Sequence, residues 1–234
     1  MKAWCCQDLR QHLTSVQRLV LLDEGEVERK AEKARELGVE LDVERLRREV
    51  VSTAAYLARA LGVERGLAHK ALALAAYAHD VGKAIRGYQE ELERAERVDR
   101  ERCPASTRGH EVWSAWAVYH VLSYCQQMGA GLTAAVAAGV ALHHSARRPI
   151  DEALDAAAAP TVDDIVTLGE LLWEGLKAVG LCDERSVEAG ISAMRNSLLS
   201  GSPRLQLRDR LMRPEATLGE AVAYVISLVD NLDA

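Results

Sequence analysis

The sequence predicts an all-α protein, and three observations lead to that expectation. Aromatic residues make up 4% of the 234 residues and Phe is absent, so the core has to be built from Ala, Leu and Val. These small side chains suit closely packed helices better than sheets. Apolar residues also recur at helical spacing along most of the chain. Finally, 49% hydrophobic and 27% charged residues are the balance of a folded globular protein. We therefore expect a helical bundle.

Taken in order, the elements are expected as follows. The first helix has its apolar stripe at Leu9, Leu13, Val16, Leu19 and Val20. The charged segment Glu24–Arg48 is expected to be a solvent-exposed helix face. A later helix has its stripe at Leu46, Val50, Ala54, Leu57 and Leu61. Further helical stretches are expected at Gly66–Lys83, Ser106–Gln127, Leu132–His144, Asp163–Val179, Ser186–Leu199 and Ala216–Leu232.

The segments between these helices are charged and poorly periodic. They are expected to be loops that could meet a substrate, at Arg94–Gly109, Ser145–Pro160 and Gly201–Glu215. Neither an internal repeat nor a low-complexity linker divides the chain. One compact domain over residues 1–234 is therefore favoured over two.

The net charge of −6 excludes a general nucleic-acid coat, because such a surface repels a phosphate backbone. Any nucleic acid would have to bind at a local site rather than over the whole surface. Met1–Arg10 has no secretory-signal pattern, and the longest apolar run, Gly129–Leu142, is shorter than the roughly 20 residues that span a bilayer. We expect a cytoplasmic protein without a membrane partner.

The cysteines are odd in number and form no Cys-x-x-Cys pair. This pattern argues against a disulfide framework and against a structural zinc site. We expect mostly buried thiols at Cys5, Cys6, Cys103, Cys125 and Cys182.

The seven histidines carry most of the functional information. His79 and Asp80 end the apolar helix ALALAAYAHDVGK, which delivers an imidazole and a carboxylate to the interior. Burying that carboxylate without a partner would cost several kcal/mol. A cation or a set of hydrogen bonds is therefore expected beside Asp80. His12 follows Leu9 by three residues on the apolar stripe of the first helix, where a lone histidine is usually a satisfied core residue.

Other polar residues join apolar faces in the same way. His110 opens a helix on its buried side, His143 and His144 end an apolar run, and Asp230 lies on an apolar face near the C-terminus. Side chains from different helices can converge as ligands in the core of a bundle. His69 and His120 each lie ten residues, or roughly 15 Å, from the candidate ligand on their helix, so we expect both in the core or on the surface.

The ordered set resembles the HD-domain metal-dependent phosphohydrolase superfamily, and Lys83 follows the Asp as in its HDxGK sequence. The segments AHDVGKA, GHEVWSAWAV, LHH and VDNL look most like the stand-alone HD nuclease of type I CRISPR interference systems. The resemblance implies an all-α HD-domain bundle over residues 1–234. It also implies divalent-metal-dependent cleavage of single-stranded DNA in antiviral defence.

The resemblance also implies a ligand set, with Asp80 bridging two ions. One ion would be held by His12, His79, Asp80 and Asp230, and the other by Asp80, His110, His143 and His144. Imidazoles with carboxylates favour manganese, nickel, iron or cobalt, with magnesium possible. Asp80 and Lys83 are the catalytic candidates, Lys83 because it could offset charge on the phosphoryl oxygens. Asp233 competes with Asp230 as the last ligand; Asp230 is preferred because helices fray at chain ends.

The chain lacks a G-x-x-x-x-G-K-[ST] phosphate loop, so the resemblance implies a separate helicase subunit and a DNA-targeting effector complex as partners. Arg147 and Arg148 are the candidate substrate-binding residues, and Arg86, Arg102 and Arg108 also flank the ligands. The alternative for these five is ordinary solvated arginines.

Two other functions stay open. One is an HD-superfamily phosphohydrolase of nucleotides or cyclic dinucleotides. Against cyclic dinucleotides, SARRP follows the histidine pair where that branch has a Gly-Tyr-Pro signature. Against a nucleotidase, a one-metal site would not need His110, His143 and His144 on apolar faces. The other is a non-catalytic helical interaction module, which metal content would distinguish.

Overall fold

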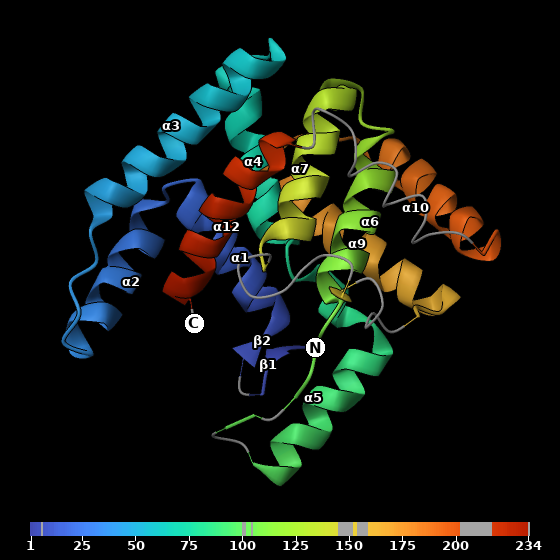
Figure 1. Cartoon of the computed structure of the whole chain (residues 1–234), viewed down its shortest axis with the longest axis horizontal. Helices are drawn as coiled ribbons and strands as arrows, with labels where there is room; N and C mark the ends of the chain where they lie inside the picture. The colour runs from blue at the N-terminus through green and yellow to red at the C-terminus, as the bar shows by residue number, and fades with distance from the viewer. Residues whose placement is uncertain are drawn as a thin grey trace.

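Helices make up nearly all the regular structure in the computed structural model (Figure 1), which describes residues 1–5, 7–99, 102–103, 105–144, 152–153, 159–201 and 217–233. The α-helices are α1 (Leu9–Val20), α2 (Glu24–Glu36), α3 (Val43–Leu61), α4 (Arg65–Ala78), α5 (Arg86–Val98), α6 (His110–Leu122), α7 (Ala130–Leu142), α9 (Val162–Val179), α10 (Glu184–Leu199) and α12 (Gly219–Asp233). Two 3-10 turns are η1 (Val81–Ala84) and η2 (Gln126–Met128). The described strands, β1 (Lys2–Trp4) and β2 (Gln7–Asp8), form one antiparallel hairpin. The predicted all-α class is confirmed.

Helix α4 forms the centre of the molecule. Its residues from Ala71 to Ala78 are all buried, and a helix that is apolar all round has to be covered on every side. Helices α1, α3, α7, α9 and α12 contact it, and Figure 1 shows α4 among them. Because Asp80 follows directly after α4, the end of this helix delivers the carboxylate to the interior.

Side chains that cap helix N-termini set where several helices begin. Asp8 accepts a hydrogen bond from the Gln11 amide at 3.0 Å, which starts α1 three residues before His12. Thr161 and Asp164 form a capping box at the start of α9. Asp164 also accepts from the Arg86 amide at 2.9 Å, so α9 is joined to the residues that follow η1.

Helices α7 and α12 pack unusually closely because each presents a glycine to the other. A Cβ atom added at Gly139 would overlap the Val222 side chain, and one added at Gly219 would overlap Ala138. The Ser227 hydroxyl of α12 donates to the His143 carbonyl at 2.9 Å. This close approach places the C-terminal end of α7 beside the last two turns of α12, where Asp230 lies.

Several sequence-based boundaries were wrong. Residues 94–98, expected in a loop, belong to α5, whose apolar stripe Tyr88, Leu92 and Ala95 is hidden among charged residues. The expected helix from Ser106 begins at His110, after Gly109 at φ 86°. The helix expected to end at Lys83 ends at Ala78, and the hairpin was not predicted. Most of the expected loops 145–160 and 201–215 lies outside the described residues.

The charged segment Glu24–Arg48 is mostly solvent-exposed, as predicted, but one side of it is buried, which was not predicted. It forms α2 and the first turns of α3, and α2 buries Glu26, Val27 and Lys30. Composition alone cannot show this, because a charged side chain is buried only where the rest of the fold supplies its partner.

The expectation of free thiols was wrong for four of the cysteines. Disulfide bonds join Cys5 to Cys103 and Cys125 to Cys182. The partners are 98 and 57 residues apart, and the folded chain brings their Cα atoms to 5.6 and 5.3 Å, within the usual range for a disulfide. No local spacing could have revealed such pairs.

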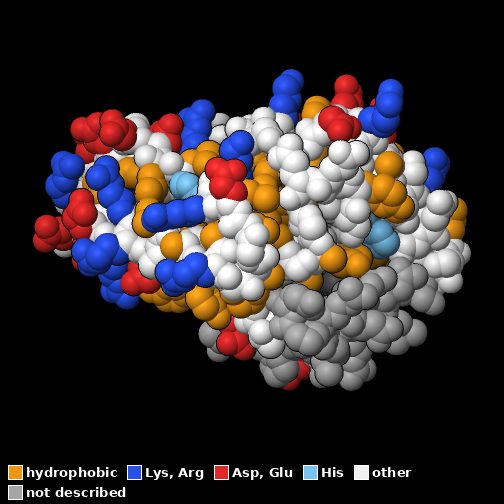
Figure 2. Space-filling view, turned by 90° about the horizontal axis from the view of Figure 1, so that it is seen from above, with side chains coloured by type: hydrophobic (Ala, Val, Ile, Leu, Met, Phe, Trp, Pro, Cys, Tyr) orange, Lys and Arg blue, Asp and Glu red, His pale blue; other side chains and the backbone are white. Residues whose placement is uncertain are grey.

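On the face seen in Figure 2, Lys and Arg side chains are interspersed with Asp and Glu, and the described residues show no continuous basic area there. Within the described part of the chain, no helix is both long enough and apolar enough to cross a bilayer.

We expect Gly139→Ala to lower the free energy of unfolding by about 1–3 kcal/mol, because the added methyl group overpacks the contact between α7 and α12. Urea denaturation followed by circular dichroism measures this. Gly25→Ala is the control: its Cβ would lie 3.6 Å from Asp23 Oδ1, an ordinary contact, and stability should stay equal or rise slightly. Equal losses in the two variants would contradict the close packing.

Replacing Cys5 and Cys103 together by Ser should lower the unfolding free energy by about 2–5 kcal/mol, because the crosslink restricts the unfolded chain. Urea denaturation without reductant gives the difference. In the wild type, no more than one of the five cysteines should react with a thiol reagent under denaturing, non-reducing conditions. Reaction of three or more would show that the disulfides are absent.

Candidate metal centre

Five helices bring polar side chains to one interior point. His79 and Asp80 follow α4, His110 is the first residue of α6, and His143 and His144 follow α7. His12 and Asp230 come from within α1 and α12. Three of these elements therefore contribute residues at a helix end, where the backbone can turn the side chain into the centre.

The turn after α4 places Asp80 against α6. Asp80 has φ −108° and ψ 3°, and η1 follows it. The Gly82 amide donates to Ser114 Oγ at 2.7 Å, and a Cβ atom at Gly82 would overlap the carbonyl oxygen of His110. Only glycine allows the two backbones to approach this closely. The glycine of the HDVGK segment thus sets the distance between Asp80 and His110.

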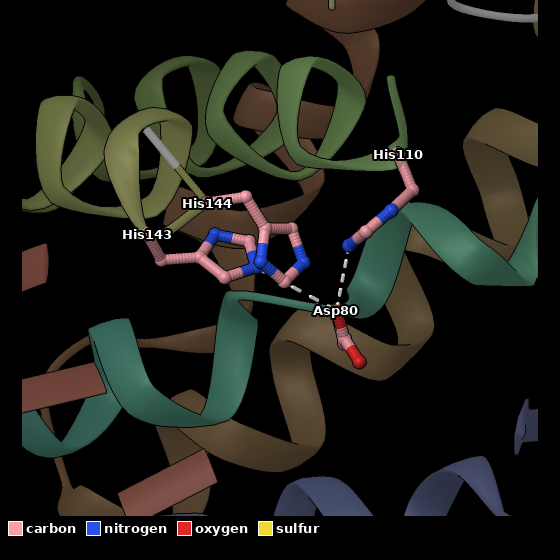
Figure 3. Close-up of side chains that lie close together, drawn as sticks. All are labelled: Asp80, His110, His143 and His144. Carbon is pink, nitrogen blue, oxygen red and sulfur yellow. Dashed lines mark ion pairs between the residues drawn. The ribbon is translucent and has the colours of Figure 1, made fainter. Parts of the chain in front are cut away.

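One ligand group consists of Asp80, His110, His143 and His144, whose ligand atoms lie within 4.8 Å of one another. Figure 3 shows His110 and His143 directed at Asp80 and His144 beside them. His110 Nε2 is 2.7 Å and His143 Nε2 is 3.8 Å from Asp80 Oδ1.

The other ligand group consists of His12, His79 and Asp230. The Nε2 atoms of His12 and His79 are 3.4 Å apart, and each is 3.4 Å from Asp230 Oδ1. They also lie 3.4 and 3.6 Å from Asp80 Oδ2. The two oxygens of Asp80 therefore face different groups, Oδ1 towards His110 and His143 and Oδ2 towards His12 and His79.

Hydrogen bonds fix the orientation of four of these imidazoles. The Nδ1 atoms of His79, His110 and His143 lie 2.7, 2.7 and 2.6 Å from the carbonyl oxygens of Ala76, Thr107 and Val140. A carbonyl can only accept, so each Nδ1 carries the hydrogen. In the neutral ring, Nε2 then presents its lone pair to the centre. His12 Nδ1 instead lies 2.7 Å from a carboxylate oxygen of Asp233.

The centre contains buried polar atoms for which the described residues supply no hydrogen-bond partner, namely Asp80 Oδ1, His110 Nε2 and His143 Nε2. All three are acceptors when the histidines are protonated on Nδ1, so none can satisfy another. A cation satisfies all three at once, and imidazole nitrogens with a carboxylate are ligands that divalent transition metals prefer. The donor set and its unsatisfied atoms therefore fit divalent metal ions.

Histidine pKa values shift in opposite directions in the two ligand groups. Burial lowers the pKa of His143 well below its usual value and that of His144 to about 3, so both rings are neutral, as ligands must be. Burial raises the pKa of Asp80, but the Lys83 ammonium, and His79 and His110 where these rings are protonated, lower it by more, so the carboxylate stays ionised. Burial lowers the pKa of His12, yet Asp233 and Asp80 raise it more, to about 9.

The remaining candidates take different places. The Lys83 ammonium pairs with Asp80 Oδ2. His69 Nε2 lies 2.7 Å from the Val20 carbonyl oxygen, and the His120 ring packs on Trp116 and Tyr119. Neither histidine belongs to a ligand group. Arg147 and Arg148 lie outside the described residues.

The other flanking arginines are not brought to the ligand groups. Arg86 is exposed and lies 3.8 Å from Glu90, and Arg102 lies 3.7 Å from Asp99. Arg108 contributes its carbonyl oxygen to a hydrogen bond from Tyr88.

The two C-terminal aspartates have separate roles. Asp230 belongs to a ligand group, whereas Asp233 contacts His12 from behind, on the Nδ1 side. Sequence reasoning missed the partners of Asp233, which are Gln7, Ser15 and Lys30. Ser15 follows His12 by three residues on the same helix face, which is the one signal that pointed to it.

The chain is similar to a known protein family over most of its length. The family model described as "Cas3, HD domain" matches residues 40–215, a range that includes His79, Asp80, Lys83, His110 and the His143–His144 pair but not His12 or Asp230. A solved structure, a CRISPR-associated Cas3 HD domain protein from Methanocaldococcus jannaschii, is 17% identical, with 98% of this chain and 99% of that chain covered and a TM-score of 0.43. No curated protein sequence matches the chain significantly. Because the family model matches most of the chain, this protein belongs to the CRISPR-associated Cas3 HD domain family, whose HD domain implies metal-dependent phosphohydrolase activity.

Proposed function

We propose that the protein is a nuclease that cleaves phosphodiester bonds of single-stranded DNA with two divalent cations in one HD domain over residues 1–234. The observation that carries this proposal is the position of Asp80, whose two oxygens face two separate ligand groups. A carboxylate in that position is suited to bridge a pair of ions. The buried acceptors at the centre add support, because the part of the chain that the structure describes offers them no hydrogen-bond donor.

The residues divide the work as follows. His12, His79 and Asp230 would hold one ion, and His110, His143 and His144 the other, with Asp80 shared. A pair of bound divalent cations supplies charge stabilisation to the attacking and leaving oxygens and lowers the pKa of water. Manganese, nickel, iron and cobalt suit the imidazole-rich set, and magnesium remains possible. The backbone carbonyls of Ala76, Thr107 and Val140 keep three of the histidines aligned.

The exposed side of the centre defines where a substrate would arrive. The Asp230 side chain is 27% exposed and His144 is partly exposed, whereas His79, Asp80 and His110 are almost fully buried. A scissile phosphodiester would approach from the Asp230 and His144 side. Arg147 and Arg148, directly after the histidine pair in sequence, are the proposed substrate-binding residues.

The partner proposals rest on the family assignment and on the charge of the chain. A net charge of −6 gives little general attraction for nucleic acid. We therefore propose that a separate helicase subunit and a CRISPR effector complex deliver the single strand to this centre, in antiviral defence.

Asp80→Ala should abolish cleavage, because it removes the group shared by both ions. The test is metal-dependent fragmentation of a labelled single-stranded oligonucleotide, with manganese, nickel or magnesium, and with a chelator as control. Circular dichroism should remain helical, and elemental analysis should show loss of metal. Wild-type cleavage rates in Asp80→Ala would refute the proposal.

The matched controls are His69→Ala and His120→Ala, histidines outside the ligand groups, whose activity should stay within a few-fold of the wild type. If the wild type binds two ions but cleaves no oligonucleotide, nucleotides and cyclic dinucleotides should be assayed next. Hydrolysis of either would favour the alternative function, a phosphohydrolase of nucleotides or cyclic dinucleotides. A wild type that binds no metal would favour the interaction module.

Lys83→Met should reduce the cleavage rate by about 100-fold while two ions remain bound, because it removes a positive charge near the reacting phosphate but no ligand. The Lys83 ammonium lies against Asp80 Oδ2 and is mostly buried, so it has no other role on the surface. Single-turnover cleavage and metal content are measured on the same sample. An unchanged rate would show that Lys83 only stabilises the Asp80 carboxylate and takes no part in cleavage.

A further inference from the structure

A buried polar network lies behind His12, on the side away from the proposed ions. Asp233 is its centre: one oxygen lies 2.7 Å from His12 Nδ1 and accepts from Gln7 Nε2 at 2.8 Å. The other oxygen lies 2.5 Å from the Lys30 ammonium and accepts from the Ser15 hydroxyl. Lys30 also donates to the Asp233 carbonyl at 3.2 Å. Asp233 and Lys30 are each 4% exposed.

His12 needs this network because it lies inside a helix. The carbonyls of Ala76 and Val140, which orient His79 and His143, belong to the last turns of α4 and α7, where helix geometry leaves carbonyls without an intrahelical partner. His12 is the fourth residue of α1, and the carbonyls around it are used within the helix. A partner for Nδ1 therefore has to come from elsewhere in the fold.

The charged groups of this network nearly balance one another. The Lys30 ammonium neutralises the Asp233 carboxylate. Behind it, Arg29 pairs with Glu26, whose Oε1 lies 2.6 Å from Ser15 Oγ. The two acidic and two basic groups cancel. The network therefore fixes the direction of the His12 ring and keeps a hydrogen on its Nδ1, and it adds little net negative potential.

Resting on the function proposed above, we propose that Asp233, held in place by Lys30 and Ser15, is a positioning residue that directs His12 Nε2 towards one of the two ions. The Asp233 carboxylate accepts the hydrogen of His12 Nδ1, so Nε2 keeps its lone pair for metal. Helix α2, which supplies Lys30 and Glu26, then serves the metal centre, although the whole helix lies outside the region matched by the family model.

The test compares the two ion affinities in the wild type, Asp233→Asn and Asp233→Ala. Cobalt(II) titrated into metal-free protein, followed by visible absorption and calorimetry, should show two binding events in the wild type. In both variants, the event that depends on His12 should weaken by about 10–100-fold, as is typical when an outer partner of a ligand is lost. The other event, from the group of His110, His143 and His144, should stay unchanged.

A second readout reports on His12 directly. Long-range proton–nitrogen NMR of the imidazoles in metal-free protein, recorded at a pH above the raised His12 pKa of about 9 so that the ring is neutral, should show the wild-type His12 protonated on Nδ1. In Asp233→Asn, the amide can donate to Nδ1 and so favours protonation on Nε2, the tautomer that cannot bind metal. A merely structural role for Asp233 would leave the tautomer unchanged and lower both affinities together.

Asp183→Asn is the matched control, since Asp183 is an Asp at the N-cap of α10, where Asn caps equally well, and it does not contact the centre. Its two affinities should equal those of the wild type. Lys30→Met is the second variant, and it should weaken the same event as Asp233→Ala by a smaller factor. Two unchanged affinities in both Asp233 variants would overturn the positioning role. Fewer than two events in the wild type would instead overturn the two-ion function.

Discussion

The Asp80 carboxylate is 2% exposed and lies between the ring nitrogens of four histidines. An ionised carboxylate in such a place costs several kcal/mol unless positive charge surrounds it. In the metal-free chain the Lys83 ammonium supplies part of that charge. The neutral ring of His143 cannot supply the rest, because its Nε2 faces Asp80 as an acceptor. The surrounding structure is built to hold these acceptors together against their mutual repulsion.

Helix ends and glycines hold the acceptor atoms around Asp80 in place. The last turns of α4 and α7 place a histidine at the point where carbonyl oxygens are unpaired, and each histidine uses one of them to fix its own ring. Gly82 lets η1 approach the first turn of α6, and Gly139 lets α7 approach α12. Local backbone chemistry thus orients the rings, and close packing of small residues sets the distances between them.

The features that could be predicted from the sequence are the local ones, and those that could not depend on packing between distant residues. The helices and the polar residues on their apolar faces were predictable, because hydrophobic periodicity is a local property of the chain. The HDVGK segment and the histidine pair were recognisable for that reason, and the structure brings all seven proposed ligands into two groups. What could not be predicted depends on contacts between distant residues. The Cys5–Cys103 and Cys125–Cys182 bonds, the buried face of α2 and the partners of Asp233 all belong to this class.

Asp230 and Asp233 illustrate where local reasoning stops. Both are acidic and lie in the last turn of α12, and the sequence favoured Asp230 because chain ends fray. In the structure Asp233 is the more buried of the two, with Lys30 against its carboxylate. Direction, not burial, therefore distinguishes the proposed ligand: Asp230 faces the Nε2 atoms of His12 and His79, and Asp233 faces the Nδ1 atom of His12. The His12 ring thus lies between the two carboxylates. Asp230, on the Nε2 side, is placed to bind an ion, and Asp233, on the Nδ1 side, is placed to orient the ring.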